Sequence, residues 1–321
     1  MTGPFAAAGG GRNYGYGRDL GYAGRQALSE YYGGGHYATV ATHGERFGEF
    51  AQWAKEEAGI RDLTRNDAQD LIKRYAEHVG ERVRQRELSV SYGQNLISSA
   101  QVTVRAMTGD TTLRVSPSEY VGARISVRTE APGAIDRDRV DAAAETMRSA
   151  GVERAAAVIE LAREFGMRER EASLGNLDRL YREAQKLGAV NIQEGTKGGR
   201  NADRWVPVSE RGREVLVRAL AARPDGSRNL VDRSETWARF RDSELRSGRE
   251  HLRGAGIKGY HDARAAYACH RYEQLTGRAA PAVSGQRPTD RAADLAARQQ
   301  ISYELGHGRA DVVASYVGGR S

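Results

Sequence analysis

Apolar residues recur three and four residues apart along most of the chain, which is the spacing of one face of an α-helix. Between residues 39 and 109 this pattern predicts three helices, and a shorter helix is expected at 25–32. The inward positions of the longer helices include Phe47, Phe50, Leu71, Ile72, Tyr75, Leu96, Ile97 and Val104. We therefore expect a small all-helical domain at 23–107. The Gly- and Tyr-rich residues 1–22 are expected to form a mobile leader, because such sequence seldom packs.

The helical pattern is interrupted at 108–135, where Gly, Thr and two prolines predict a linker between domains. Helices are then expected at 138–149, 152–165, 176–187, 209–222, 234–253 and 261–275, with a short one after Arg168 and a last one from about Asp290. Two short apolar runs, 189–193 and 204–208, flank a Gly-rich segment and predict a β-hairpin. Residues 278–290 hold prolines and glycines without an apolar period and are expected to form a loop. The predicted fold is mainly α, and residues 136–321 form a mostly helical domain with a small antiparallel sheet.

Composition excludes several classes of protein. The 321 residues contain no run of 18 apolar residues, and residues 1–11 lack a basic region followed by a long apolar stretch. We therefore expect neither a transmembrane helix nor a secretory signal. The single cysteine, Cys269, excludes an internal disulfide and a Cys-rich zinc site, which fits a cytoplasmic protein.

The charge of the chain is unevenly distributed. Residues 1–110 are neutral overall, so the net charge of +7 lies in residues 111–321. All but five of the 49 basic residues are arginines. Because arginine can hold a phosphate through two parallel hydrogen bonds, the second half predicts a polyanionic partner, with nucleic acid favoured over membrane.

One ordered set of chemically capable residues lies in this basic half. The sequence has no G-x-x-x-x-G-K-[ST], H-E-x-x-H, G-x-S-x-G or C-x-x-C motif, so nucleotide hydrolysis and zinc chemistry lose support. The set consists of Arg168 with Glu171, Lys197 in the hairpin loop, His261-Asp262-Ala263-Arg264, Leu305-Gly306-His307, and Tyr316 nine residues after His307. Each part alone arises often by chance, whereas the ordered combination does not.

This combination resembles the tyrosine recombinase family, the phage-integrase-like enzymes. Its parts are similar to the family's first arginine motif (Phe165 to Glu171), its lysine hairpin and following strand (Thr196 to Gly199, then Arg204 to Val208), its H-x-x-R box (His261 to Arg264) and its L-G-H ending with a tyrosine (Leu305 to His307, then Tyr316). The resemblance covers about residues 138–318. Residues 23–107 are similar, by pattern, to the family's core-binding (SAM-like) domain. Within the family, the sequence looks most like integrases of conjugative or genomic-island elements.

The resemblance implies a site-specific DNA recombinase or integrase. In this family a tyrosine oxygen attacks a DNA phosphodiester and leaves a 3′-phosphotyrosyl link and a free 5′-hydroxyl, without metal, ATP or another cofactor. The resemblance implies that Tyr316 is the nucleophile and that Lys197 is the general acid at the 5′-oxygen. Arg168 and Arg264 would each hold a non-bridging oxygen through paired hydrogen bonds. His261 would assist proton movement at the tyrosine or bind phosphate, and His307 would donate to a non-bridging oxygen. These residue types suit phosphoryl transfer, which needs positioning and charge stabilisation. A free tyrosine has a pKa of about 10, so the nucleophile needs nearby cations.

The implied partners are double-stranded DNA recombination sites, further copies of the chain in a homo-tetramer on DNA, and accessory DNA-bending or directionality proteins. No membrane partner is implied. Two alternatives stay open: a catalytically silent DNA-binding protein on the same fold, and a type IB topoisomerase-like enzyme.

The sequence departs from the family pattern at three places. Ala263 stands where a larger apolar residue is usual. Arg264 and His307 are farther apart than usual, and the excess lies at Gly277–Asp290. We expect this insertion to lie away from the scissile phosphate, and to be mobile or to touch a partner subunit. Only five residues follow Tyr316, which argues against the exchange of a C-terminal segment between subunits that many relatives show.

Overall fold

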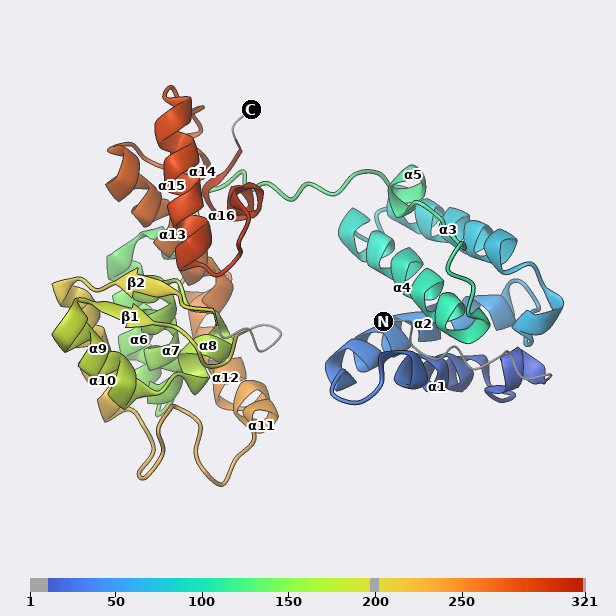
Figure 1. The fold of residues 1–321 in the computed structure, drawn as a ribbon, viewed down its shortest axis with the longest axis horizontal. Coiled ribbons are helices and arrows are strands. Elements are labelled where there is room, and N and C mark those ends of the chain that lie inside the picture. Colours follow the sequence, from blue (N-terminus) through green and yellow to red (C-terminus); the bar gives the residue numbers. More distant parts are fainter. Residues whose placement is uncertain (1–10, 197–201, 320–321) are drawn as a thin grey trace. The chain divides into compact units, whose positions relative to one another are not determined.

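The computed structural model describes residues 11–196 and 202–319, and the chain divides into two compact units between Ile125 and Ser126 (Figure 1). We call them the N-terminal unit and the C-terminal unit. Both consist mostly of helices, and each has a separate hydrophobic core. The predicted fold class, mainly α with a small antiparallel sheet, is confirmed. None of the helices in the described ranges is long and apolar enough to cross a membrane.

The N-terminal unit is a bundle of short and medium helices. Its described elements are η1 (Arg12–Gly15), α1 (Leu20–Tyr32), α2 (Tyr37–Glu56), η2 (Leu63–Arg65), α3 (Ala68–Arg84), α4 (Val90–Thr108) and α5 (Pro117–Val121), where η denotes a 3₁₀-helix. Asp19, Asp67 and Ser89 each accept a hydrogen bond from the backbone N–H three residues later, which satisfies a free donor at the start of α1, α3 and α4. The predicted inward residues, including Phe47 and Phe50, are buried in its core.

Part of the expected mobile leader is folded. Residues 12–15 form η1, and the buried Asn13 joins this turn to η2. The Asn13 side-chain oxygen accepts a hydrogen bond from the Leu63 N–H at 2.9 Å, and the Asn13 N–H donates to Asp62 at 2.9 Å. The folded N-terminal unit therefore begins before residue 23, because one buried amide supplies contacts that Gly-rich backbone lacks.

Most of the expected linker at 108–135 is packed as well. At its beginning, α5 contacts α3 and α4. At its end, the Arg128 N–H donates to the Ala314 carbonyl at 3.0 Å, and the Arg128 guanidinium donates to Asp262 at 3.2 Å. Residues 122–127 between them are exposed. The connection between the two units is therefore shorter than the sequence predicts.

The C-terminal unit contains the remaining elements. Its described elements are η3 (Gly133–Ile135), α6 (Arg137–Ser149), α7 (Glu153–Phe165), α8 (Glu169–Leu174), α9 (Leu177–Leu187), β1 (Ala189–Asn191), β2 (Trp205–Pro207), α10 (Glu210–Ala221), α11 (Trp237–Asp242), α12 (Glu244–Gly254), α13 (Tyr260–Thr276), α14 (Pro281–Ser284), α15 (Arg291–Glu304), η5 (Ala310–Val313) and α16 (Ala314–Val317).

Helices α7 and α13 form the centre of this unit. Helix α7 is buried over most of its length and α13 over residues 262–269, and the two pack against each other. Helix α7 also contacts α6, α10 and α12. Their many alanines allow this close packing, since a small side chain lets two helix backbones approach. The packing brings the C-terminal end of α7, which precedes Arg168, near the helix that carries His261 and Arg264.

The predicted hairpin is present. Strands β1 and β2 pair antiparallel, with Val190 opposite Val206 and Asn191 opposite Trp205. Both valines are buried against the helical core. Lys197, which the sequence places in the connecting loop, lies outside the described residues.

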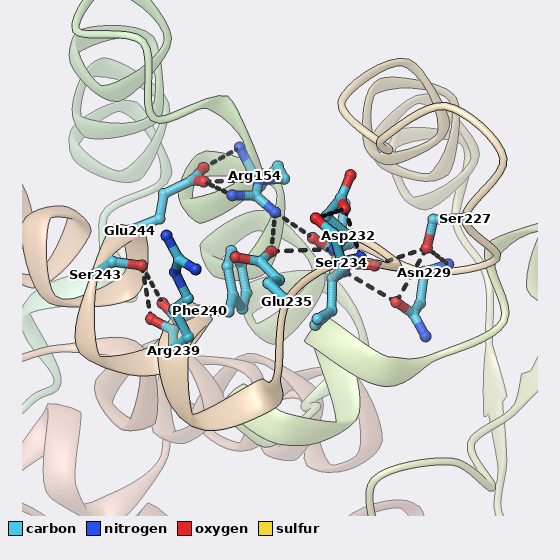
Figure 2. A network of polar contacts seen from close by, with 12 residues as sticks. Arg154, Ser227, Asn229, Asp232, Ser234, Glu235, Arg239, Phe240, Ser243 and Glu244 are labelled. Atoms are coloured by element: carbon cyan, nitrogen blue, oxygen red, sulfur yellow. Dashed lines mark hydrogen bonds and ion pairs between the residues drawn. The ribbon is translucent and has the colours of Figure 1, made fainter.

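The expected single helix at 234–253 is two helices that meet at Ser243 (Figure 2). At the junction the Ser243 backbone is not helical (φ −107°, ψ −91°), and the Ser243 hydroxyl donates to the Arg239 carbonyl at 2.6 Å. Arg154, at the start of α7, contacts the chain on both sides of the junction. Its Nε donates to Glu244 at 2.6 Å, and its Nη1 pairs with Glu235 and donates to the Leu230 carbonyl at 3.2 Å. This one guanidinium thus ties the segment before α11 and the beginning of α12 to α7.

The expected loop at 278–290 contains the short helix α14. Ala280 and Ala282 are buried, and α14 packs against α16, the helix that carries Tyr316. The backbones approach so closely that a Cβ on Gly318 would lie 2.6 Å from the Ala282 nitrogen. The insertion is therefore packed around α14, where its contact is with this chain's own C-terminal helix, whereas residues 283–287 are exposed.

Candidate active site

The first arginine motif forms a turn that aims two charged groups at each other. Helix α7 ends at Gly166 in the left-handed conformation (φ 62°), where a Cβ would lie 2.5 Å from the Tyr267 ring. The chain then enters α8 with Arg168 as its N-cap. The Arg168 N–H donates to Glu171 at 2.7 Å, and the Arg168 Nη1 donates to the other oxygen of the same carboxylate at 2.6 Å. Glycine is required here because the turn is both left-handed and tightly enclosed.

Glu171 is the shared anion of the site. It is fully buried and accepts hydrogen bonds from both Nη atoms of Arg204 at 2.9 Å, and Arg264 Nη1 lies 3.6 Å from it. Burial alone would raise the pKa of this carboxyl, but Arg204, Arg264 and Arg168 lower the pKa to about 2. Three guanidiniums and one carboxylate leave a cluster with a net charge of +2.

Arg264 connects the separate motifs. Its fully buried guanidinium donates to the carbonyls of Gly166 and Leu305, the latter at 2.6 Å. Its Nη2 also lies 3.2 Å from His307 Nε2, and its Nε lies 3.4 Å from the Tyr316 hydroxyl. Burial lowers the pKa of Arg264 to about 10, so the group stays cationic at neutral pH. One side chain thus ties the first arginine motif, the L-G-H segment and the tyrosine together.

The Tyr316 hydroxyl lies 3.0 Å from His307 Nε2. Burial, together with Arg264, Arg168 and Arg204, lowers the pKa of His307 to about 4, so this imidazole is neutral at pH 7. Arginine only donates hydrogen bonds, so the Nε2 that faces Arg264 carries a lone pair. The Tyr316 hydroxyl therefore donates to His307. In this arrangement His307 Nε2 is an acceptor, whereas the resemblance implies a donor to phosphate.

His261 covers the other side of the tyrosine. It lies in the first turn of α13, and its ring centre is 5.4 Å from that of Tyr316. Loss of water around the ring, with Arg264, Arg128 and Arg168 nearby, lowers the pKa of His261. The structure thus brings five of the six predicted site residues together: Arg168, His261, Arg264, His307 and Tyr316.

A cavity of about 1120 Å³ opens beside these groups. Arg168, Thr196, Arg204, Tyr303 and His307 are among the residues that line it. Thr196 directly precedes Lys197, so the predicted general acid follows a residue of the cavity wall in sequence. Within residues 11–196 and 202–319, no group of three or more His, Cys, Asp or Glu side chains could hold a metal ion.

Arg204 is the site residue that sequence reasoning missed. It is 4% exposed and makes the fork on Glu171 described above. The sequence offered one signal, an arginine at the start of the strand that follows the lysine hairpin. Its contact with a residue 33 positions earlier depends on how the hairpin packs on α8, which no local pattern contains.

Comparison with known proteins agrees with this architecture. Residues 122–270 match the family model described as Integrase. Among solved structures, the XerH site-specific recombinase in a post-cleavage complex with a palindromic difH substrate has a TM-score of 0.53 at 14% identity, over 92% of this chain and 80% of that chain. The pre-cleavage XerH complex with difH gives a TM-score of 0.51 at 14% identity, over 87% and 76%. Among curated proteins, no match to the sequence is found.

The fold is therefore similar to that of the XerH site-specific recombinase. The sequence match over residues 122–270 is to integrases, and it spans the first arginine motif, the hairpin and the H-x-x-R box.

Proposed function

We propose that this protein is a site-specific DNA recombinase that cuts and rejoins DNA through a 3′-phosphotyrosyl intermediate, with Tyr316 as the nucleophile. The observation that carries the proposal is the position of the Tyr316 hydroxyl. It lies within hydrogen-bond distance of a neutral histidine, His307, and of the buried Arg264, beside a cluster of net charge +2. The integrase match and the recombinase fold support the same activity.

The proposed cleavage step balances as follows. The Tyr316 oxygen attacks the phosphorus, so a tyrosine–phosphorus bond forms and the bond from phosphorus to the 5′-oxygen breaks. The tyrosine proton passes through His307 Nε2, which lines the cavity, to solvent, and the leaving 5′-oxygen takes a proton from Lys197. A phenolate and a phosphodiester together bring two negative charges into the transition state, which the charge of +2 on the arginine cluster complements. Rejoining is the reverse reaction, and it needs no ATP or metal because the new link conserves the bond energy.

The other site residues would bind the phosphate. Arg168 lines the cavity and is placed to hold a non-bridging oxygen, while Arg264 would hold the second one once the tyrosine moves onto phosphorus. His261, next to the Tyr316 ring, would bind phosphate or assist proton movement. The XerH neighbours are bound to difH DNA, which supports double-stranded recombination sites as the partner.

The finer assignments rest on the sequence motifs. We infer that the chain acts as a homo-tetramer on DNA with accessory proteins, and that it is an integrase of a conjugative or genomic-island element.

The test is formation of a covalent protein–DNA complex. Duplexes that bind the Tyr316→Phe variant are selected from a random-sequence library, and a nick is then placed at each position so that cleavage becomes irreversible. Wild-type protein should form a complex that survives detergent, while Tyr316→Phe should bind the same duplexes and form none. Tyr303→Phe is the matched control, because Tyr303 lines the same cavity but is half exposed. Its hydroxyl accepts a hydrogen bond from the Trp205 N–H. A covalent complex that persists in Tyr316→Phe, or none from wild type, would contradict the proposal.

A further inference from the structure

Arg204 has the contacts of a functional residue rather than of a surface arginine. Its backbone N–H donates to the Asn191 side chain at 2.9 Å, and its carbonyl accepts from the Ile192 N–H at 3.1 Å. Asn191 in turn donates to Asp203 at 2.8 Å. The hairpin thus fixes the backbone from which this guanidinium extends.

The side chain extends toward the site. Both Nη atoms bond the two oxygens of Glu171, whose carboxylate also receives the Arg168 N–H and Nη1. A bidentate fork of this kind fixes the plane of the carboxylate. Since Glu171 is fully buried and holds Arg168 through two bonds, the orientation of Arg168 depends on the orientation that Arg204 gives to Glu171.

Arg204 also shapes the L-G-H segment. Gly306 has φ +66°, and a Cβ at this position would lie 2.9 Å from Arg204 Nη1 and 3.0 Å from its Cδ. The glycine next to His307 therefore lies directly on the Arg204 side chain. Arg204 lines the cavity together with Arg168 and His307, and its buried Nε has no hydrogen-bond partner within the described residues.

We propose that Arg204 is a positioning residue of the strand-cleavage site, which acts on Arg168 through Glu171 and on His307 through Gly306. This inference rests on the proposed function. It also assigns to Arg204 one of the three positive charges that give the cluster its net charge of +2.

The test measures covalent complex formation in a single turnover with the nicked duplexes described above. Arg204→Ala should lower the cleavage rate by about 100-fold, within the range of 10²–10³ found when one preorganised donor is removed from a catalytic site. DNA affinity should change less than threefold, since Arg204 is 4% exposed. Added guanidinium ion should restore part of the rate, while added methylammonium should not, because only the planar fork fits both Glu171 oxygens.

Arg154→Ala is the matched control. Arg154 is also a partly buried arginine bound to two carboxylates of the same unit, Glu235 and Glu244 (Figure 2). Among the described residues, its side-chain hydrogen bonds and ion pairs are with residues 230, 235 and 244 and not with the site residues. This variant should lose thermal stability, keep its cleavage rate per folded molecule and show no response to guanidinium. If Arg204→Ala fails to fold, Arg204→Lys keeps the charge without the fork and should still cleave at least tenfold slower than wild type.

The outcomes separate the two proposals. If wild type cleaves and Arg204→Ala or Arg204→Lys cleaves at the same rate, the positioning role of Arg204 is overturned and the proposed function stands. A slower Arg204→Ala that guanidinium does not rescue would also overturn it, because the loss would then reflect general damage. No covalent complex from wild type would refute the proposed function, and the role of Arg204 with it.

Discussion

At the scale of single residues, the hydrogen bond between His307 and Tyr316 determines how the site responds to acid. The imidazole is held neutral because burial, Arg264, Arg168 and Arg204 all disfavour its charged form and lower its pKa from 6.5 to about 4. A proton on His307 would remove the acceptor for the tyrosine hydroxyl. It would also add a fourth positive charge beside the three arginines.

This pKa shift predicts a pH-dependent loss of stability. Between pH 6.5 and about 4 the unfolded chain binds a proton at His307 that the folded chain does not, so the free energy of unfolding falls as the pH falls through this window. His307→Gln removes this contribution. Its urea midpoint should therefore fall less than that of wild type between about pH 7 and pH 5. His251→Gln, at the end of α12, is the control, and its urea midpoint should fall as much as that of wild type. If the midpoint falls equally in all three proteins, His307 is not held neutral in the folded protein.

The same residues show what the sequence could and could not predict about the site. Arg168, His261, Arg264, His307 and Tyr316 could be predicted from the order of the motifs and its resemblance to the tyrosine recombinase family, because that order is readable without knowing any contact. The arrangement among them was not predictable. That Tyr316 donates to His307, and that Arg204 closes on Glu171, depends on contacts between elements far apart in the chain.

At the scale of elements, α14 supports the helix that carries Tyr316. Gly318, two residues after the tyrosine, has φ +94° and lies against the α14 backbone, and its carbonyl accepts from the buried Arg298 at 3.0 Å. The insertion thus helps to hold the helix that carries Tyr316.

Substitution of Gly318 should therefore disturb catalysis as well as stability. Gly318→Ala places a Cβ 2.6 Å from the Ala282 nitrogen, a backbone atom that cannot move alone. We expect a loss of about 2 kcal/mol in the free energy of unfolding and at least a tenfold lower yield of covalent complex per folded molecule. Gly285→Ala is the control, because Gly285 has φ +67° but nothing within 4 Å of its Cβ position. Backbone strain should lower the free energy of unfolding of that variant by about 1 kcal/mol, and its yield of covalent complex should match that of wild type. If both variants cleave like wild type, α14 has no influence on Tyr316.

Element prediction succeeded where apolar periodicity was long. The helices at 137–149, 153–165 and 260–276 match their predicted spans closely, as does the hairpin. It failed at Ser243, where the amphipathic pattern continues but the backbone leaves the helical conformation, and at α14, a four-residue helix too short to show a period.

At the scale of the whole molecule, two separate cores are joined by a short exposed segment. Residues 122–127 are exposed, while the chain on both sides of them is packed on one unit or the other. The sequence predicts two domains, and the chain divides into two compact units. The predicted linker is too long, because the contacts of α5 and Arg128 are tertiary and leave no local pattern.

Limited proteolysis tests this organisation. Trypsin should cut first after Arg124, which is exposed and lies in this segment, and should release two stable fragments that meet at residues 124 and 125. Mass spectrometry of the earliest products identifies the cut. A first cut within α7 or α13, whose backbones are buried, would contradict the two-core organisation.

The central claim is that Tyr316 becomes linked to the 3′ side of a broken DNA strand. The most direct measurement uses a nicked duplex labelled on either side of the cut, with peptide mapping of the purified covalent complex by mass spectrometry. The account predicts that the label on the 3′-phosphate side stays with the protein, that the other fragment carries a free 5′-hydroxyl, and that the modified peptide contains Tyr316. A link to the 5′ side, or a modified peptide that contains Tyr303 instead, would contradict it.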